Sequence, residues 1–260
     1  MGEAMRLSII TAVLDSHEVV RRQAIHYKKM NLPENIELIL VDDSSTPPIK
    51  DFPPFNIYRY DNPAEWTQPA ARNFGVKQAK GERIIVTDID HIVTRELIEY
   101  VLSRPDIDFM KFKREVAILN KDGELVQNYD AVRAYGYEKR RYRKNGFHIA
   151  PHTNSFAIRR DLYLELGGVS EKFVGTGKYP NREEVNIRGK LKGLRNEGKI
   201  TILDADTEGD PRPTLYMIPN GRFCGDDDFN PFGLFHTLSR KHPDRIRLTN
   251  KEKARLRREA

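Results

Sequence analysis

The sequence predicts an α/β fold in which a mostly parallel sheet is flanked by helices. In the first 90 residues, candidate elements follow the order strand, helix, strand, strand, helix, strand, which is the order of a doubly wound sheet. The strand expected at 83–87 contains the continuous apolar run IIV at 84–86. Such runs are typical of parallel strands that are covered on both faces.

The elements of the first half follow from apolar runs and from the residues that end them. Asp15 and Ser16 are of the type that caps a helix N-terminus, and Gly81 closes the second helix. The proline-rich segment 46–54 predicts a loop. We expect strands at 6–13, 36–41, 56–60 and 83–87, and helices at 17–30 and 68–80.

The second half of the chain is less regular. Lys121-Asp122-Gly123 predicts a hairpin turn between apolar segments. Residues 127–150 are aromatic and basic without a clear period, so we expect a loop or insertion. We also expect helices at 94–102, 161–166, 182–196 and 250–259, and strand segments at 109–119, 125–126, 153–158, 200–203 and 215–218.

Composition indicates a globular protein, and its 260 residues are enough for one large domain or for one domain plus an appendage. The single cysteine, Cys224, excludes a disulfide within the chain and favours a reducing, cytoplasmic setting. The net charge of +6 is uneven, with basic clusters at 139–144 and 251–258. Such clusters attract nucleic acid, anionic lipid or phosphorylated ligands, although a run of charge is most often a solvated face.

Acidic residues follow two of the predicted strands. Asp88 and Asp90 come directly after the strand at 83–87, and Asp42-Asp43 follow the strand at 36–41. Ligands of open α/β sheets bind beyond the carboxyl ends of the strands. In an extended segment, side chains two residues apart point to the same side, so Asp88 and Asp90 could face one divalent cation. Taken alone, the Asp-x-Asp pattern fits a simple turn equally well.

No glycine-rich phosphate loop follows a strand. A nucleotide would therefore be held through its metal and its base. The segments SIITAV, LILVDDSS, QPAARNFGVKQAKGERIIVTDID and HTNSFAIRRDLYLELGGVSEKF stand in an order that resembles the family-2-type glycosyltransferases of the glycosyltransferase A (GT-A) fold, over about residues 5–200.

The resemblance implies a single GT-A domain spanning residues 1–260. Its nucleotide-sugar half would cover about 5–105 and its acceptor half about 106–245, followed by a basic helix or tail at 246–260. It also implies an inverting hexosyl- or N-acetylhexosaminyltransferase that requires Mn²⁺ or Mg²⁺. The expected donor is a nucleotide-diphospho-sugar, with UDP as the expected nucleotide. The expected acceptor is a hydroxyl group of a saccharide or of another molecule. No nucleic-acid partner is expected, and the basic clusters could dock the enzyme on a membrane surface.

The resemblance assigns the donor side of the site. Asp42 would hydrogen-bond the nucleoside, and Thr11 and Ala12 would line the base. Arg72 and Asn73 match the family's Ala-Arg-Asn step near the donor. Their alternative role is that of an ordinary polar helix face.

The resemblance also assigns the metal ligands. Asp90 is the expected direct ligand, whereas Asp88 would face the metal, the donor ribose or a metal-bound water. His236 would complete the shell from far down the chain, unless it is a packed core residue. His91 is expected beside the ligands and not among them. The cation would bridge the two phosphates and stabilise the departing charge.

The general base is expected in an acidic pair that opens a helix. Glu183 and Glu184 hold that place here, and the alignment favours Glu184. Asn181 and Glu184 also form an N-x-x-E capping pair, so a purely structural role stays open.

The positions of several further residues in the sequence suggest contacts with the acceptor or the donor. Asn154 and Asp227 are acceptor-side candidates, although Asp227 lies in an Asp-Asp-Asp run that also suits a solvated turn. His148 and His152 could contact the acceptor. Trp66, the only tryptophan, could stack on a sugar or base, or could cap the core.

Two other functions remain as alternatives. A nucleotidyltransferase also pairs carboxylates with Mg²⁺, but its glycine-rich N-terminal loop with basic residues is missing from TAVLDSHEVVRR. A non-catalytic nucleic-acid or lipid-surface binder would act through the basic clusters. Its binding would fall steeply with salt and would not depend on Asp90.

Overall fold

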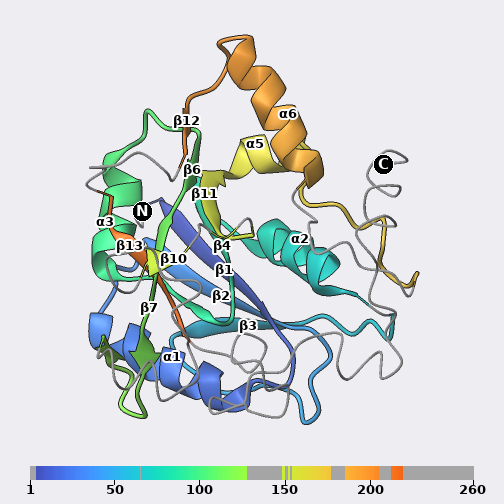
Figure 1. Cartoon of the computed structure of the whole chain (residues 1–260). Helices are drawn as coiled ribbons and strands as arrows, with labels where there is room; N and C mark the ends of the chain where they lie inside the picture. The colour runs from blue at the N-terminus through green and yellow to red at the C-terminus, as the bar shows by residue number, and fades with distance from the viewer. Residues whose placement is uncertain are drawn as a thin grey trace.

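The structure, a computed structural model, describes residues 4–64, 66–127, 148–149, 152, 154–176, 185–204 and 212–218. Within them, the centre of the molecule is a seven-stranded sheet with the order β12-β6-β11-β4-β1-β2-β3 (Figure 1). Helices cover both faces of this sheet, as the sequence predicts.

Four parallel strands form the core of the sheet, and their bounds agree with the predicted ones to within one residue. They are β1 (Leu7–Val13), β2 (Ile36–Asp42), β3 (Phe55–Arg59) and β4 (Arg83–Asp88). Consecutive residues of β4 serve opposite faces, since Ile84 and Val86 pack in one hydrophobic cluster and Ile85 in another. This two-sided burial explains why β4 is continuously apolar from Ile84 to Val86.

Helices pack on both faces of these strands. α2 (Gln68–Gln78) contributes Ala71 and Val76 to the cluster that holds Val86. On the other face, α1 (His17–Met30) and α3 (Arg95–Ser103) pack against the strands. The Thr94 hydroxyl accepts a hydrogen bond from the Leu97 amide at 3.3 Å, which confirms it as the cap of α3.

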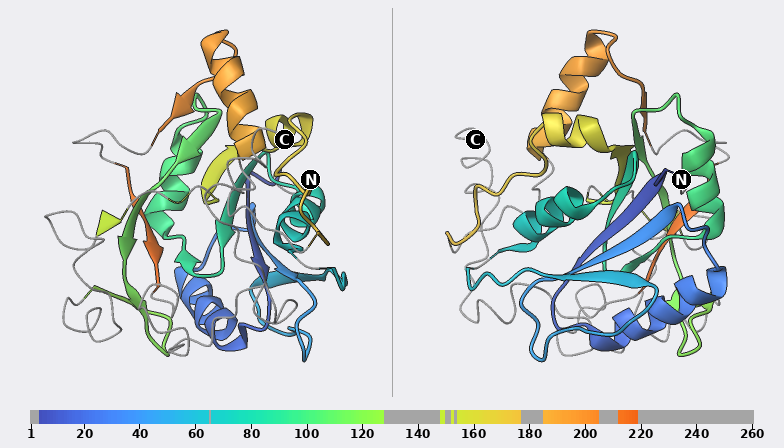
Figure 2. Two further views of the ribbon diagram at one scale, coloured as in Figure 1. Left: turned by 45° about the vertical axis from the view of Figure 1, so that its right-hand side comes forward. Right: turned by 180° about the vertical axis from the view of Figure 1, so that it is seen from behind.

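The outer strands make the sheet mixed. β11 (Phe156–Arg159) runs antiparallel between β4 and β6 (Phe109–Lys111), and β12 (Ile202–Leu203) pairs parallel with β6. α5 (Arg160–Glu165) follows β11 directly. α6 (Val185–Asn196) and α1 lie at opposite ends of the molecule (Figures 1 and 2).

A second sheet lies to one side of the central one (Figure 2). The segment expected at 109–119 is divided among three strands, because the chain leaves the central sheet after β6. The strands outside the central sheet are β5 (His91–Ile92), β7 (Lys113–Val116), β10 (His148–Ile149) and β13 (Thr214–Met217), with β8 (Ile118–Leu119) and β9 (Leu125–Val126) forming the predicted hairpin.

Two local predictions are wrong. Ser16 does not cap α1 through its side chain, because its hydroxyl donates to the Leu14 carbonyl at 2.9 Å. The Asp15 carboxylate instead accepts from the Thr46 amide at 2.7 Å. The expected loop at 127–150 also contains a strand, β10, which pairs with β7. The expected helix at 250–259 lies outside the described residues.

The parallel register brings the acidic strand ends together. Ala12 of β1 pairs with Asp88 of β4, and the next residue, Val13, pairs with Asp42 of β2. The carboxyl ends of β1, β2 and β4 thus meet at one edge of the sheet. Among the described residues, none of the helices combines the length and the apolar composition that crossing a membrane requires.

Candidate metal and donor site

The candidate site lies where the chain passes from the central sheet into the second sheet. Asp88 ends β4, and His91 begins β5, where it pairs with Met217 of β13. The Asp90 carbonyl, in the turn between them, accepts from the Ile218 amide at 2.8 Å. Both sheets therefore hold this turn in place.

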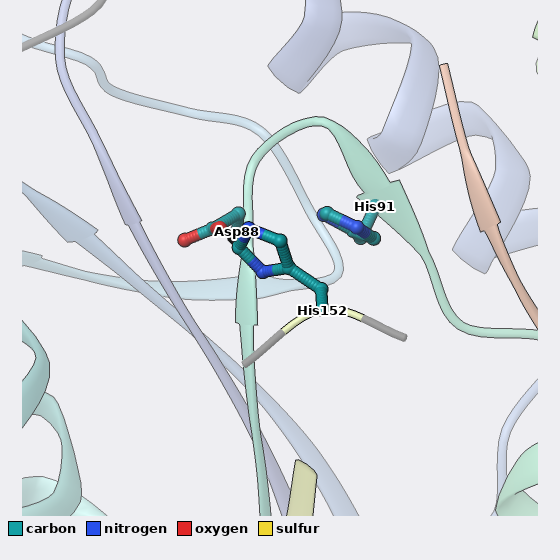
Figure 3. Close-up of side chains that lie close together, drawn as sticks. All are labelled: Asp88, His91 and His152. Atoms are coloured by element: carbon teal, nitrogen blue, oxygen red, sulfur yellow. Dashed lines mark ion pairs between the residues drawn. The ribbon is translucent and has the colours of Figure 1, made fainter. Parts of the chain in front are cut away.

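Three ligand-type side chains converge here. Asp88, His91 and His152 each offer one ligand atom, and the three atoms lie within 4.8 Å of one another. Figure 3 shows the Asp88 carboxylate beside the His152 ring, with His91 next to them. The two imidazole centroids are 4.9 Å apart. Asp88 is one of the predicted ligands, whereas the two histidines give the cluster more nitrogen than the sequence indicated.

Helix α2 orients the Asp88 carboxylate. Its Oδ1 atom accepts from the Arg72 guanidinium and, at 3.2 Å, from the Gln68 side-chain amide. The Arg72 side chain is only 1% exposed. The Oδ2 atom lies 3.2 Å from Nδ1 of His152. One oxygen is thus held by the helix and the other faces the histidine cluster.

Asp90 and Arg114 lie against opposite nitrogen atoms of His91. Oδ1 of Asp90 is 2.8 Å from Nδ1, and a guanidinium nitrogen of Arg114, on β7, is 3.0 Å from Nε2. Burial raises the pKa of Asp90, but the interaction with the adjacent His91, including a hydrogen bond to its ring, outweighs this effect together with His152 and Arg114, and leaves its pKa below the ordinary value. Asp90 is therefore ionised at neutral pH.

Both histidines of the cluster have depressed pKa values. Burial lowers the pKa of His91, although Asp90 opposes the shift. Burial, together with the charges of His91 and Arg114, holds the pKa of His152 well below its ordinary value. Both imidazoles are thus neutral at pH 7, which is the form that binds metal ions.

The predicted nucleoside residue Asp42 is buried and bonded within the protein. Its Oδ1 accepts from the Ser45 amide at 2.9 Å, and its Oδ2 accepts from the Ile49 amide at 3.0 Å and from Arg59. These bonds shape the loop after β2. Thr11 and Ala12 are also buried, at the end of β1 beside Asp88. Nucleoside and base contacts of these three residues stay predictions.

Asn73 connects α2 to the segment after α5. Its side-chain oxygen accepts from the Tyr163 hydroxyl at 2.7 Å and from the Val169 amide at 3.1 Å. Its side-chain nitrogen donates to the Val169 carbonyl at 2.9 Å and to Glu171 at 2.7 Å. The amide thus serves packing in this structure, and its predicted donor contact stays a prediction.

Of the other predicted residues, the structure describes the side chains of only Trp66 and Asn154. Trp66 is 3% exposed and packs against Phe173, which favours the core-capping alternative. Asn154 has a buried side-chain oxygen without a hydrogen-bond partner among the described residues. The remainder lie outside what the structure describes, namely Glu183, Glu184, Asp227, His236 and the side chain of His148.

Sequence reasoning placed His152 on the acceptor side and His91 beside the ligands. His91 carried a signal, because it directly follows the Asp-x-Asp pattern. No local feature of the sequence indicated that His152 belongs to the site. It reaches the site because β11, which begins shortly after it, pairs antiparallel with β4, with Phe156 opposite Val86.

Comparisons with known proteins agree with this fold. The crystal structure of TarS 1-349 from S. aureus aligns with a TM-score of 0.51 and 16% identity, over 82% of this chain and 60% of that one. The same TarS fragment in complex with UDP aligns with a TM-score of 0.51 and 15% identity, over 84% and 62%. The mannosyltransferase PcManGT from Pyrobaculum calidifontis, in complex with GDP-Man and Mn²⁺, gives a TM-score of 0.47 at 14% identity, over 82% and 57%.

This chain spans about three fifths of the length of those structures. No curated protein matches it significantly. A family model described as "Glycosyltransferase like family 2" matches residues 9–181, which is more than half of the chain. By this match, and by a mostly parallel α/β fold shared with GT-A neighbours, the chain belongs to the glycosyltransferase family 2-like proteins.

Proposed function

We propose that this protein is a metal-dependent, inverting glycosyltransferase that moves a hexosyl or N-acetylhexosaminyl group from a UDP-sugar to a hydroxyl of a saccharide acceptor. The observation that carries the proposal is the convergence of Asp88, His91 and His152 at the carboxyl edge of the sheet. Ligands of open α/β sheets bind at this edge. The UDP bound by TarS supports uridine as the nucleoside.

The residues present fit a divalent cation. They offer one carboxylate oxygen and two neutral imidazoles within 4.8 Å, with Asp90 close by. Such a cation supplies Lewis-acid stabilisation of a departing diphosphate when it is bound. Arg72 and Gln68 keep Asp88 oriented toward the cluster. Arg114 adds a fixed positive charge beside it.

Activation of the acceptor would come from the acidic pair before α6. The structure describes α6 from Val185 onward, and Glu184 directly precedes this residue in the sequence. Glu184, or Glu183 as the alternative, would take the proton of the acceptor hydroxyl. The inverting outcome rests on the resemblance. A cytoplasmic setting and membrane docking through the basic clusters at 139–144 and 251–258 also stay predictions.

A donor screen tests the proposal. UDP-, GDP- and CDP-sugars are incubated with the protein and Mn²⁺, and nucleoside diphosphate release is measured. We expect release from a UDP-sugar, reduced at least about tenfold in Asp88→Asn. Asp106→Asn is the matched control, because Asp106 is an exposed carboxylate that pairs with Arg104 before β6.

The products distinguish the alternatives. Proton NMR of the released or transferred sugar shows whether the anomeric configuration inverts. Release of pyrophosphate in place of UDP would indicate nucleotidyl transfer. If no nucleotide sugar binds, and Asp88→Asn behaves like the wild type, the glycosyltransferase proposal is overturned.

A further inference from the structure

We propose that the cation of this site is bound through nitrogen as well as oxygen, by His91 and His152 together with Asp88. The site should consequently prefer Mn²⁺, Co²⁺ and Zn²⁺ to Mg²⁺, and should bind them before any nucleotide. This inference rests on the proposed metal-dependent function, but metal binding can be measured apart from sugar transfer.

The first support is a buried nitrogen atom without a hydrogen bond. Nδ1 of His152 is buried and makes no hydrogen bond with a described residue, although it lies 3.2 Å from Oδ2 of Asp88. Nδ1 of His91, in contrast, is paired with Oδ1 of Asp90 at 2.8 Å. Leaving Nδ1 of His152 unsatisfied costs free energy, so this atom calls for a partner such as a cation.

The second support is the spacing of these atoms. Two ligands bound about 2.1 Å from one cation at right angles lie about 3 Å apart. The distance between Oδ2 of Asp88 and Nδ1 of His152, 3.2 Å, is close to this value. A nitrogen and an oxygen at this separation, without the alignment of a hydrogen bond, are placed as neighbouring ligands of one ion.

The third support is that defined elements of the fold position the three ligand side chains. Asp88 ends β4, His91 begins β5, and His152 precedes β11. The Asp88 Oδ1 atom is already held by Arg72 and Gln68, so Oδ2 is the atom that faces His152. Asp88 and His152 are therefore already placed side by side before any diphosphate arrives.

The composition of the cluster determines which cations it prefers. Mg²⁺ favours oxygen ligands and is usually held by one or two carboxylates plus substrate phosphates. Imidazole nitrogen favours transition metals, whose affinities increase from Mn²⁺ to Co²⁺. A site with two imidazoles should therefore follow the order Mg²⁺, Mn²⁺, Co²⁺ from weakest to tightest.

Arg114 competes with the cation for His91. Its guanidinium is always protonated, so it donates to Nε2 of His91 at 3.0 Å. A metal at Nε2 would use the same lone pair. A metal at Nδ1 would leave the proton on Nε2, facing the guanidinium. In both cases metal binding by His91 requires the Arg114–His91 hydrogen bond to open.

The test uses the full chain, freed of metal and without nucleotide. MgCl₂, MnCl₂ and CoCl₂ are titrated by calorimetry, and bound Mn²⁺ is examined by pulsed EPR for coupling to nitrogen. We expect at least about tenfold tighter binding of Co²⁺ than of Mg²⁺, and nitrogen coupling on Mn²⁺. His152→Ala should weaken Co²⁺ binding at least about tenfold and reduce the nitrogen coupling.

Two further variants complete the test. His17→Ala is the matched control and should leave affinity unchanged, because His17 contacts the Pro47 carbonyl and is not part of the cluster. Arg114→Met should tighten metal binding, since it removes the competitor for His91. Equal affinity for Mg²⁺ and Co²⁺, absence of nitrogen coupling, or wild-type affinity in His152→Ala would overturn the inference.

The result can be separated from that of the donor screen. Nitrogen-bound metal without any reaction of a nucleotide sugar would support this inference and contradict the proposed function. Metal-dependent sugar transfer without nitrogen coupling would support the proposed function and contradict this inference.

Discussion

Asp88 uses its two carboxylate oxygens in different ways. One is held by Arg72 and Gln68 from α2, and the other lies beside His152. A carboxylate that is 14% exposed keeps its charge at little cost only when such partners are present. The orientation of the candidate ligand therefore depends on a buried arginine that need not touch the cation.

Replacing Arg72 alone should destabilise the protein more than replacing Arg72 and Asp88 together. Arg72→Met leaves the Asp88 carboxylate without its buried partner, and we expect a loss of about 3–5 kcal/mol in the free energy of unfolding. Urea denaturation measures this loss. The double variant Arg72→Met/Asp88→Asn should recover part of it, because no uncompensated charge remains. Additive losses in the double variant would show that the two side chains are not coupled.

At the scale of elements, α2 connects the candidate site to α5. Its N-terminal part reaches the site through Gln68 and Arg72. The next residue, Asn73, bonds to Tyr163 of α5 and to the segment after it. That segment begins with Gly167 and Gly168, which both have positive φ angles, +79° and +68°. A Cβ atom at Gly168 would collide with the Asn73 side-chain oxygen, whereas one at Gly167 would meet open space.

The two glycines provide a matched pair of variants. Gly167→Ala should cost only the backbone strain of a positive φ angle, about 1 kcal/mol. Gly168→Ala should cost about 1–3 kcal/mol more, because the methyl group must displace the Asn73 amide. Thermal or urea unfolding of both variants measures the difference. Equal losses would mean that Asn73 shifts freely and does not fix the approach of α2 to α5.

At the scale of the whole molecule, the site joins two sheets. β4 belongs to the central sheet, β5 belongs to the second sheet, and His152 enters beside β11. A cation bound by Asp88, His91 and His152 would connect segments that are far apart in the chain. Such a cation binds the folded state and not the unfolded one, so it should stabilise the fold.

Metal should therefore raise the melting temperature in the absence of nucleotide. At a Co²⁺ or Mn²⁺ concentration a hundredfold above Kd, the stabilisation is about 2.7 kcal/mol, which corresponds to about 5–10 °C. Differential scanning fluorimetry with and without a chelator measures the shift. His152→Ala should lose most of it and His17→Ala none. A shift of equal size in all three proteins would indicate binding elsewhere.

Much of the fold was predictable because its signals are local. Continuous apolar runs predicted β1, β2 and β4 to within one residue, and Thr94 predicted the start of α3. The sequence did not reveal that Ser16 fails to cap α1, because its hydroxyl donates to the Leu14 carbonyl instead. The division of 109–119 among three strands depends on which sheet each part joins, and that depends on distant partners such as β11 and β13.

The same distinction applies to the candidate site. The amino-acid sequence determines that Asp88 and Asp90 stand at and just after the end of a buried strand. The rule for parallel sheets then determines the edge at which a ligand binds. Only the tertiary structure decides that His91 and His152 join Asp88. The reason is that their convergence depends on the pairing of β5 with β13 and of β11 with β4, and such non-local pairings leave no periodic signal in the chain.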